Sequence, residues 1–149
     1  MATLAEIEQF VREHPDISDP GRPASDEWID QAEKYLALRF PEEYRQFLRR
    51  WGTLAFGSVE FYGIAGDSFE TASVPNGIWY TMKLRREIGL PQHFVVLCNN
   101  DGHEYYLLDT SDPRGSVVKW SVSTRQIRAA SPATLFDFML ETARIFLSD

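Results

Sequence analysis

The chain has 149 residues, of which 44% are hydrophobic and 13% aromatic, and its net charge at pH 7 is −7. This length and composition predict one globular domain, residues 1–149, with a well-filled core. A lone cysteine excludes both an internal disulfide and a structural zinc site of paired thiolates. The sequence shows no signal peptide and no apolar run of about 20 residues, so we expect a soluble, cytoplasmic protein.

All of the excess negative charge lies near the start of the chain. Residues 1–43 contain eleven acidic and four basic side chains, whereas residues 44–149 contain eleven of each. Negative charge of this kind repels nucleic-acid phosphates and anionic lipid, and it favours a cationic partner. A surface whose charge serves only solubility is the alternative interpretation.

Two helices are predicted in the first 40 residues. Thr3 and Glu6 have the spacing of a capping box, ahead of a helix that ends at Pro15. The connector DISDPGRPASD is rich in turn residues, and Ser25 then caps a second helix that extends to about Phe40.

A third helix is predicted to begin at Pro41, whose missing N–H costs nothing in a first turn, and to end at Gly52. Its apolar residues recur at helical spacing and form one stripe, made of Tyr44, Phe47, Leu48 and Trp51. We interpret this stripe as part of the core, because aromatic periodicity of this kind is first of all a packing signal.

Beyond the third helix the pattern becomes that of strands. The segment SVEFYGI alternates as a strand does, an acidic loop spans Gly66 to Glu70, and a fourth helix is predicted from Val74 to Ile88. The runs HFVVLC, HEYYLLD, SVVKWSV and RQIRA then predict an antiparallel meander. A last amphipathic helix is predicted from Pro132, with Ser131 as its cap. Helices, then a meander, then a helix indicate the α+β class.

Cys98 and His103 are the pair that suggests catalysis. If NNDG is the whole turn between two strands, these residues lie opposite each other with Cβ atoms about 5 Å apart. The acidic neighbours Asp101, Glu104 and Asp109 disfavour the thiolate that a nucleophile needs, so we interpret the segment as a hairpin turn. Cys98, Asp101 and His103 crowd into one tight turn and do not suit a common metal ion. We predict no catalytic residue, no metal site and no cofactor.

The stretch LALRFPEEYRQFLRRWGTLAFGSVEFYGI, Leu36 to Ile64, resembles the SUKH superfamily of Smi/Knr type. The resemblance is carried by the spacing of Pro41, Tyr44, Phe47-Leu48, Gly52 and Tyr62-Gly63, and downstream by FVVLCNNDGHEYYLLDT and SVVKWS. It implies an α+β fold, in which a twisted and mainly antiparallel sheet is flanked by N-terminal helices and a C-terminal amphipathic helix. It also implies that the domain has no catalytic residues.

Many bacterial members of this superfamily bind and neutralise a toxin, often a nuclease, that is delivered between competing cells. The resemblance therefore implies a non-enzymatic bacterial immunity protein whose partner is a cationic toxin domain, with no nucleic-acid or membrane partner. A regulatory or scaffold module, like the cell-wall assembly regulators of yeast, is the alternative, and a small enzyme that uses Cys98 is a third possibility. The oligomeric state has no signal in the sequence.

A nuclease must offer a cationic surface to phosphates, so an inhibitor that covers this surface gains from negative charge. We therefore predict that the toxin-binding face includes five acidic residues of the second helix and the acidic loop, namely Asp26, Glu27, Asp30, Asp67 and Glu70. Solvated helix and loop faces are the alternative for each of these residues.

Overall fold

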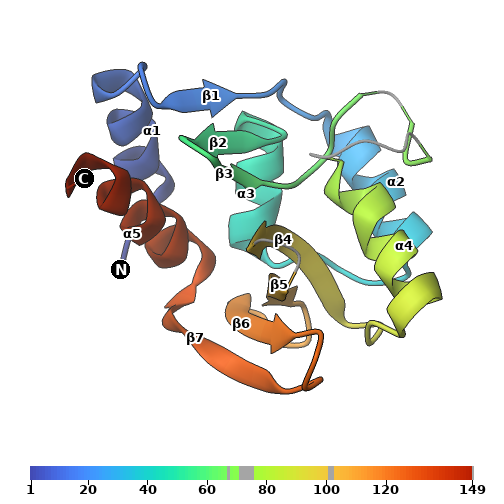
Figure 1. Ribbon diagram of the computed structural model, residues 1–149. Coiled ribbons are helices and arrows are strands. Elements are labelled where there is room, and N and C mark those ends of the chain that lie inside the picture. Colours follow the sequence, from blue (N-terminus) through green and yellow to red (C-terminus); the bar gives the residue numbers. More distant parts are fainter. Residues whose placement is uncertain (67, 71–75, 101–102, 149) are drawn as a thin grey trace.

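The computed structural model describes residues 1–66, 68–70, 76–100 and 103–148, which form five helices and two antiparallel sheets (Figure 1). In chain order the elements are α1 (Leu4–Glu13), β1 (Ser18–Pro20), α2 (Asp26–Leu36), α3 (Glu42–Arg50), β2 (Leu54–Phe56), β3 (Val59–Phe61), α4 (Gly77–Ile88), β4 (Phe94–Asn100), β5 (Glu104–Asp109), β6 (Ser116–Ser121), β7 (Ile127–Thr134) and α5 (Leu135–Ser148). This order confirms the predicted α+β fold, with helices ahead of a meander and one helix after it.

The first two helices begin at the predicted caps. The Thr3 and Ser25 hydroxyl oxygens each accept a hydrogen bond from the backbone N–H three residues later, at 3.3 Å and 3.1 Å. α2 ends at Leu36 and not near Phe40, because Ala37 takes a left-handed conformation with a φ of 56°. The residue before a proline is confined to extended backbone, so the chain has to leave the helix ahead of α3.

The smaller sheet has the strand order β1-β2-β3, and the sequence pattern predicts only one of these three strands. β3 lies in the predicted strand, whereas β1 lies in the connector that we expected to be irregular. Strands of three residues are too short to show alternation, and Pro20 argues against a strand at this place. The proline is tolerated because β1 is at the edge of the sheet, where a missing donor leaves no ladder bond unmade.

The larger sheet has the strand order β4-β5-β6-β7, with every neighbouring pair antiparallel, so the predicted meander is confirmed. β7 continues to Thr134, which pairs with Ser116 of β6, and α5 begins only at Leu135. The predicted helix start at Pro132 with a cap at Ser131 is therefore wrong. Pairing with β6 outweighs the local capping signal, and a shift in the register of β6 and β7 accommodates the proline.

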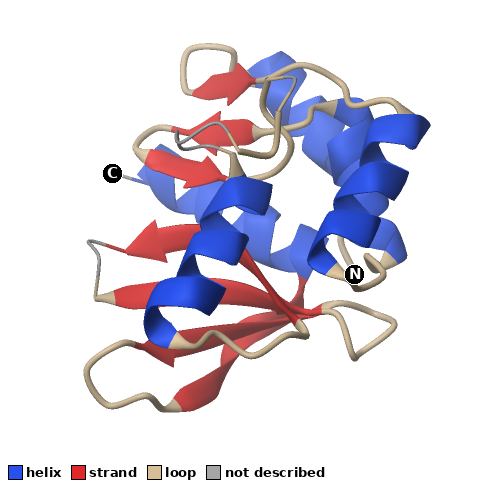
Figure 2. Cartoon of the chain, turned by 90° about the vertical axis from the view of Figure 1, so that its right-hand side faces the viewer, coloured by secondary structure: helices blue, strands red, loops and turns tan. Residues whose placement is uncertain are grey.

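Two hydrophobic cores lie on opposite faces of the larger sheet. Helices α3 and α5 pack on the face that carries Val95 and Leu97, whereas α4 lies against the face that carries Val96 and Leu107 (Figure 2). Adjacent residues of β4 point to opposite faces, as the period of a strand requires. The stripe on α3 is buried in the first core, and its four side chains, Tyr44, Phe47, Leu48 and Trp51, are at most 2% exposed. This burial confirms the stripe as core.

α3 and β3 are followed by two glycines whose backbones nearly touch. Gly52 has a φ of 73°, and a Cβ atom at position 63 would lie 1.9 Å from the Gly52 carbonyl oxygen. This oxygen accepts a hydrogen bond from the Ile64 N–H at 3.1 Å, and the Tyr44 hydroxyl donates to the Tyr62 carbonyl, also at 3.1 Å. Both glycines belong to the spacing that carries the family resemblance, and the reason is steric, since no larger residue fits at this approach.

We expect Gly63→Ala to lower the free energy of unfolding by about 3 kcal/mol or more, because the added methyl overlaps a hydrogen-bonded backbone oxygen. Gly89→Ala is the matched control. Gly89 has a φ of 71° but no atom within 4 Å of an added Cβ, so this variant gains only the left-handed strain of about 1 kcal/mol. Urea denaturation followed by tryptophan fluorescence measures both losses, and equal losses would contradict the steric explanation.

Candidate functional site

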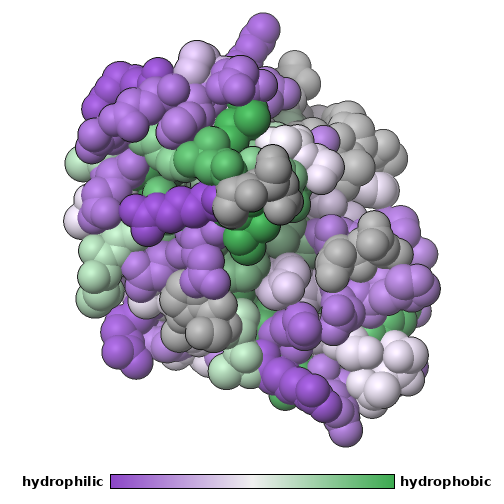
Figure 3. All heavy atoms as spheres, turned by 60° about the vertical axis from the view of Figure 1, so that its left-hand side comes forward, coloured by the Kyte–Doolittle hydropathy of each residue, from purple (hydrophilic) through white to green (hydrophobic). Residues whose placement is uncertain are grey.

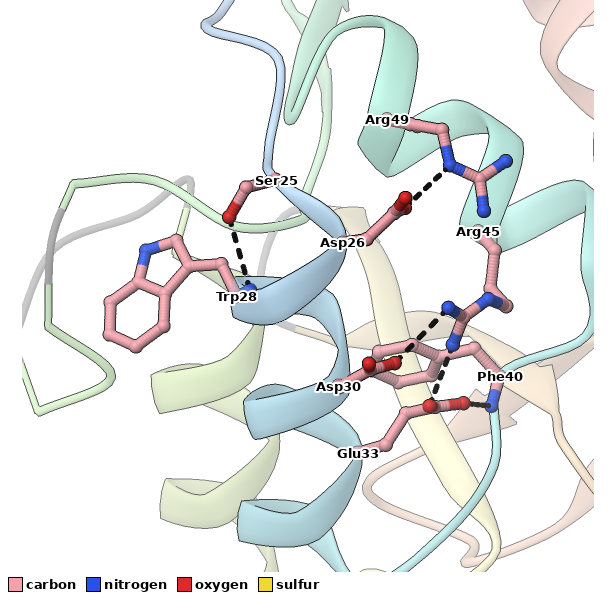
Figure 4. A network of polar contacts seen from close by, with 8 residues as sticks. All are labelled: Ser25, Asp26, Trp28, Asp30, Glu33, Phe40, Arg45 and Arg49. Carbon is pink, nitrogen blue, oxygen red and sulfur yellow. Dashed lines mark hydrogen bonds and ion pairs between the residues drawn. The ribbon is translucent and has the colours of Figure 1, made fainter.

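The acidic side chains of α2 divide between two faces of the helix. Asp26 and Asp30 face α3, where the Arg49 Nε lies 2.8 Å from Asp26 Oδ1 and the Arg45 Nη2 lies 3.2 Å from Asp30 Oδ1 (Figure 4). Glu27 is exposed and forms no ion pair with any residue that the structure describes. Of the three predicted α2 site residues, Glu27 therefore has the carboxylate that is free to meet a partner.

Arg45 is held more firmly than an ordinary surface arginine. Its Nη1 lies 2.7 Å from Glu33 Oε1, and the other Glu33 oxygen accepts the backbone N–H of Phe40, also at 2.7 Å (Figure 4). The side chains of Arg45 and Glu33 are only 21% and 15% exposed. This pair connects α2, α3 and the turn between them, so we assign it to stability and not to partner binding.

Trp28 brings the acidic loop against the start of α2. Its indole Nε1 donates a hydrogen bond to the Gly66 carbonyl at 3.3 Å, and its ring stacks on Phe69 with 4.4 Å between centroids. Glu70, the next residue, is exposed, and its N–H donates to the Ser68 hydroxyl at 3.1 Å. The structure thus places Glu70 in a loop that packs on the helix carrying Glu27.

Asp67, the fifth predicted site residue, lies outside the described residues. One side of α2 faces neither α3 nor this loop. The helical step of 100° per residue places three exposed residues on this side, Glu27, Gln31 and Lys34. The candidate surface is therefore this ridge of α2 together with Glu70.

A hollow of about 560 Å³ adjoins this surface, between the segment that leads into α2 and the segment that follows β3. Trp28 forms one wall, and Ala24, Thr53, Ile64 and Gly66 form the others. The lining is mainly apolar and backbone; its polar side chains are those of Arg22 and Thr53, and it holds no carboxylate, imidazole or thiol. It suits a side chain inserted by a partner better than it suits a reaction.

A second hollow, of about 350 Å³, lies between α5 and strands β4 and β5. On the side of the molecule where α1 and α5 lie, Figure 3 shows hydrophobic side chains gathered together and bordered by hydrophilic ones. Cys98, Tyr106, Phe138 and Phe146 line this hollow, and Glu141 is its one charged side chain. A lone carboxylate gives no general acid and base pair, so the hollow carries no recognisable chemistry.

The predicted opposition of Cys98 and His103 is wrong. β4 continues through Asn100, which pairs with Glu104, and the partner of Cys98 across the strands is Tyr106. His103 lies in the turn and is exposed. The ladder begins at Asn100 and Glu104 and runs to Cys98 and Tyr106 without a shift in register, so the pairing starts two residues later in β4 and one later in β5 than NNDG predicts.

Burial raises the pKa of the Cys98 thiol to about 12. The thiol is therefore protonated at neutral pH, and protonated thiols are poor nucleophiles and poor metal ligands. Within the described ranges, no group of three His, Cys, Asp or Glu side chains could hold a metal ion. Asp101, the third member of the metal set considered from the sequence, lies outside those ranges.

These observations define an α+β protein whose candidate site is a charged surface beside a hollow, and not a catalytic centre. The sequence model of the SUKH_5 family, described as SMI1-KNR4 cell-wall, matches residues 4–144. The chain therefore belongs to the SUKH family, which includes immunity proteins as well as members of the Smi1/Knr4 type and is generally non-catalytic. No curated protein sequence matches the chain. In the part of the chain that the structure describes, no helix is long and apolar enough to cross a membrane.

Sequence reasoning missed two determinants of this surface. The ion pairs of α3 with α2 join residues 12 to 23 positions apart, and no local pattern predicts which charges meet across two helices. The helical pattern of the second helix also does not show that the Trp28 indole reaches the loop at Gly66. An indole N–H needs a partner when it is partly buried, and this need was the signal available.

We expect Arg45→Gln to lower the free energy of unfolding by about 2 kcal/mol, because it leaves the poorly exposed Glu33 carboxylate without its cation. Arg49→Gln is the control and should cost less than about 1 kcal/mol, because Arg49 and Asp26 are 44% and 68% exposed. Urea denaturation of both variants checks the difference. A loss for Arg49→Gln as large as that for Arg45→Gln would contradict the distinction between the two pairs.

We expect the Cys98 thiol to resist modification by a disulfide reagent at pH 8 in the folded protein, because its pKa is about 12. Labelling should become rapid in strong denaturant, which exposes the thiol and restores an ordinary pKa near 8.5. Reaction in the folded state at the rate of a free thiol would reopen the case for a nucleophile.

Proposed function

We propose that this protein is an immunity protein that binds and neutralises a cationic toxin domain, of nuclease type, in competition between bacteria. The observation that carries the proposal is the pair of exposed carboxylates, Glu27 and Glu70, on elements joined through Trp28. Family membership supports it, because immunity proteins belong to the same family. The protein would act in the cytoplasm as one domain and without catalysis.

The mechanism is occlusion. A nuclease holds its substrate through cationic groups, and an inhibitor that presents carboxylates to those groups prevents the phosphates from binding. Complementary charge also speeds the encounter, and this matters when a toxin must be captured before it cuts nucleic acid. No bond in the toxin has to be broken.

The residues contribute unequally. Glu27 and Glu70 have no cation of their own among the described residues, so each can bind a toxin lysine or arginine directly. Asp26 and Asp30 already pair with Arg49 and Arg45, so their carboxylates are less available to a toxin cation than that of Glu27. Asp67 stays in the proposed face on the strength of the sequence alone.

The hollow beside Trp28 gives the proposed interface an anchor. Protein interfaces draw most of their affinity from a few large side chains buried in pockets, whereas charges at the rim set the encounter rate. We propose that the toxin inserts an aromatic or aliphatic side chain between Trp28 and Thr53 while its cations reach Glu27 and Glu70.

A regulatory or scaffold module of the cell-wall type is the second candidate. The description of the matching family as SMI1-KNR4 cell-wall favours it. The two functions differ in genetic context, since an immunity protein is encoded beside its toxin. The absence of a neighbouring gene for a large secreted protein would favour the module.

The decisive experiment co-expresses this chain with the C-terminal domain of a large secreted protein encoded next to it. We expect growth to be restored and the two proteins to purify as a complex that weakens with salt. Glu27→Lys and Glu70→Lys should each lower the affinity about tenfold at low ionic strength, because attraction becomes repulsion.

Glu13→Lys, an exposed carboxylate at the end of α1, is the matched control and should leave the affinity unchanged. In Figure 1, α3 lies between α1 and α2, so this residue is on the far side of α3 from the proposed face. Persistent toxicity with no complex would exclude immunity to that neighbour. Equal effects of all three substitutions would still support the toxin as the partner, but they would show that Glu27 and Glu70 do not form its binding face.

A further inference from the structure

β7 leaves one edge of the larger sheet open. It is the last strand in the order β4-β5-β6-β7 and lies on the outside of the molecule (Figure 1). Its residues Ile127, Arg128 and Ala129 are exposed, and the Ile127 side chain is 46% exposed. An open edge that carries a large aliphatic side chain is unusual, because proteins commonly shield such edges.

The backbone hydrogen bonds of β6 fix which groups of this edge are free. The Ser121 N–H donates to the Gln126 carbonyl of the β6–β7 turn, and the Val122 N–H points the other way, to His103 beside β5. Hydrogen bonding alternates along an antiparallel pair, so Arg128 bonds to Lys119 of β6. The N–H and C=O groups of Ile127 and Ala129 consequently point away from the sheet.

The edge is cationic although the chain is acidic. Residues 113–136 contain four basic side chains, Arg114, Lys119, Arg125 and Arg128, and no acidic one. Arg114 pairs with Asp112 and Lys119 pairs with Glu104. Arg125 and Arg128 form no ion pair with the residues that the structure describes. They stand at the turn and on the strand that borders the open edge.

A small cleft of about 170 Å³ lies on the same face of the sheet as Arg128. Glu104, Lys119, Ser121, Thr124, Gln126 and Arg128 line it, and the Lys119 Nζ lies 3.3 Å from the Glu104 carboxylate. Arg128, which forms no ion pair with the described residues, is therefore the cation of this cleft that can receive an acidic side chain of a strand laid against β7.

We infer that the β7 edge binds an acidic, extended segment of a partner protein by strand addition. The free backbone groups supply the hydrogen bonds, and alternate acidic side chains reach Arg128 and the cleft. Two arginines repel a second copy of the same edge, so the charges that protect the strand from self-pairing also select an acidic partner. Nucleic acid fits less well, because a net charge of −7 opposes it.

This inference is independent of the proposed toxin-binding face, which is acidic and seeks a cationic partner. The two surfaces involve different elements, α2 with its loop on one side and β7 on the other. A partner of β7 is therefore a second protein or an acidic segment outside the toxin's cationic surface.

The test uses the full chain and a fluorescein-labelled peptide of alternating glutamate and valine, about six residues long, which is a common strand length. Fluorescence anisotropy should report binding of this peptide and none of a lysine–valine peptide. Arg128→Glu should weaken binding about tenfold, because a salt bridge becomes a repulsion. Arg86→Glu, which reverses an exposed arginine of α4, is the matched control and should have no effect.

Ala129→Pro separates strand addition from loose charge attraction. It keeps every charge and every β6–β7 hydrogen bond, but it removes one outward N–H, so binding should be lost. Circular dichroism checks that the variant folds. A peptide N-methylated at alternate residues makes the same test on the unaltered protein and should also fail to bind.

Three outcomes would overturn the inference. The first is no binding of the acidic peptide at millimolar concentration. The second is equal binding by the N-methylated peptide, which would show attraction without strand pairing. The third is preferential binding of a single-stranded oligonucleotide or of a second copy of the chain, lost in Arg128→Glu, which would assign the edge to another partner.

Discussion

The architecture depends on the close approach of Gly52 and Gly63. Gly52 lies just after the end of α3, and Gly63 lies just after the end of β3. The Gly52 carbonyl accepts a hydrogen bond from the Ile64 N–H, and the Gly63 carbonyl accepts one from Gly77, the first residue of α4. The Tyr62 N–H donates to the Leu97 carbonyl of β4 at 2.7 Å, so the same segment joins the two sheets. Because the backbones meet without side chains between them, this approach sets how α3, β3, α4 and β4 lie relative to one another.

The charge of the chain is distributed in two ways that the net value of −7 hides. Arg45 and Arg49 of α3 neutralise much of the acidic face of α2 from within, so the carboxylates that a partner meets are fewer than the composition suggests. Residues 44–149, which include the meander, carry equal numbers of acidic and basic side chains. The cations of the meander that have no ion pair among the described residues, Arg125 and Arg128, lie at the β7 edge. The same fold can thus present surfaces of opposite character, each supported by elements that the core holds in place.

The sequence predicted the elements whose signals are local. Caps at Thr3 and Ser25, the stripe of α3 and the alternation of the meander each lie within one segment, and all are confirmed. The features that it missed depend on a distant partner. β1 exists only because β2 pairs with it, and β7 continues to Thr134 because Ser116 of β6 pairs there. The register that sets Cys98 opposite Tyr106 appears only in the paired strands. The same limit applies to the candidate site, where α2 carboxylates could be named but their partners on α3 could not.

In α2 the residues that stabilise the fold are separate from those of the proposed binding surface. Ile29, Ala32 and Leu36 are buried in the core, and Asp26, Asp30 and Glu33 meet the arginines of α3. Trp28 and Tyr35 hold the loop through Phe69, so the exposed residues that face neither α3 nor the loop are Glu27, Gln31 and Lys34. Three of the four directions around the helix are constrained by packing, and the fourth is free. Substitutions on the free ridge should therefore cost little stability. The proposed binding surface can vary while the packed faces of the helix are kept.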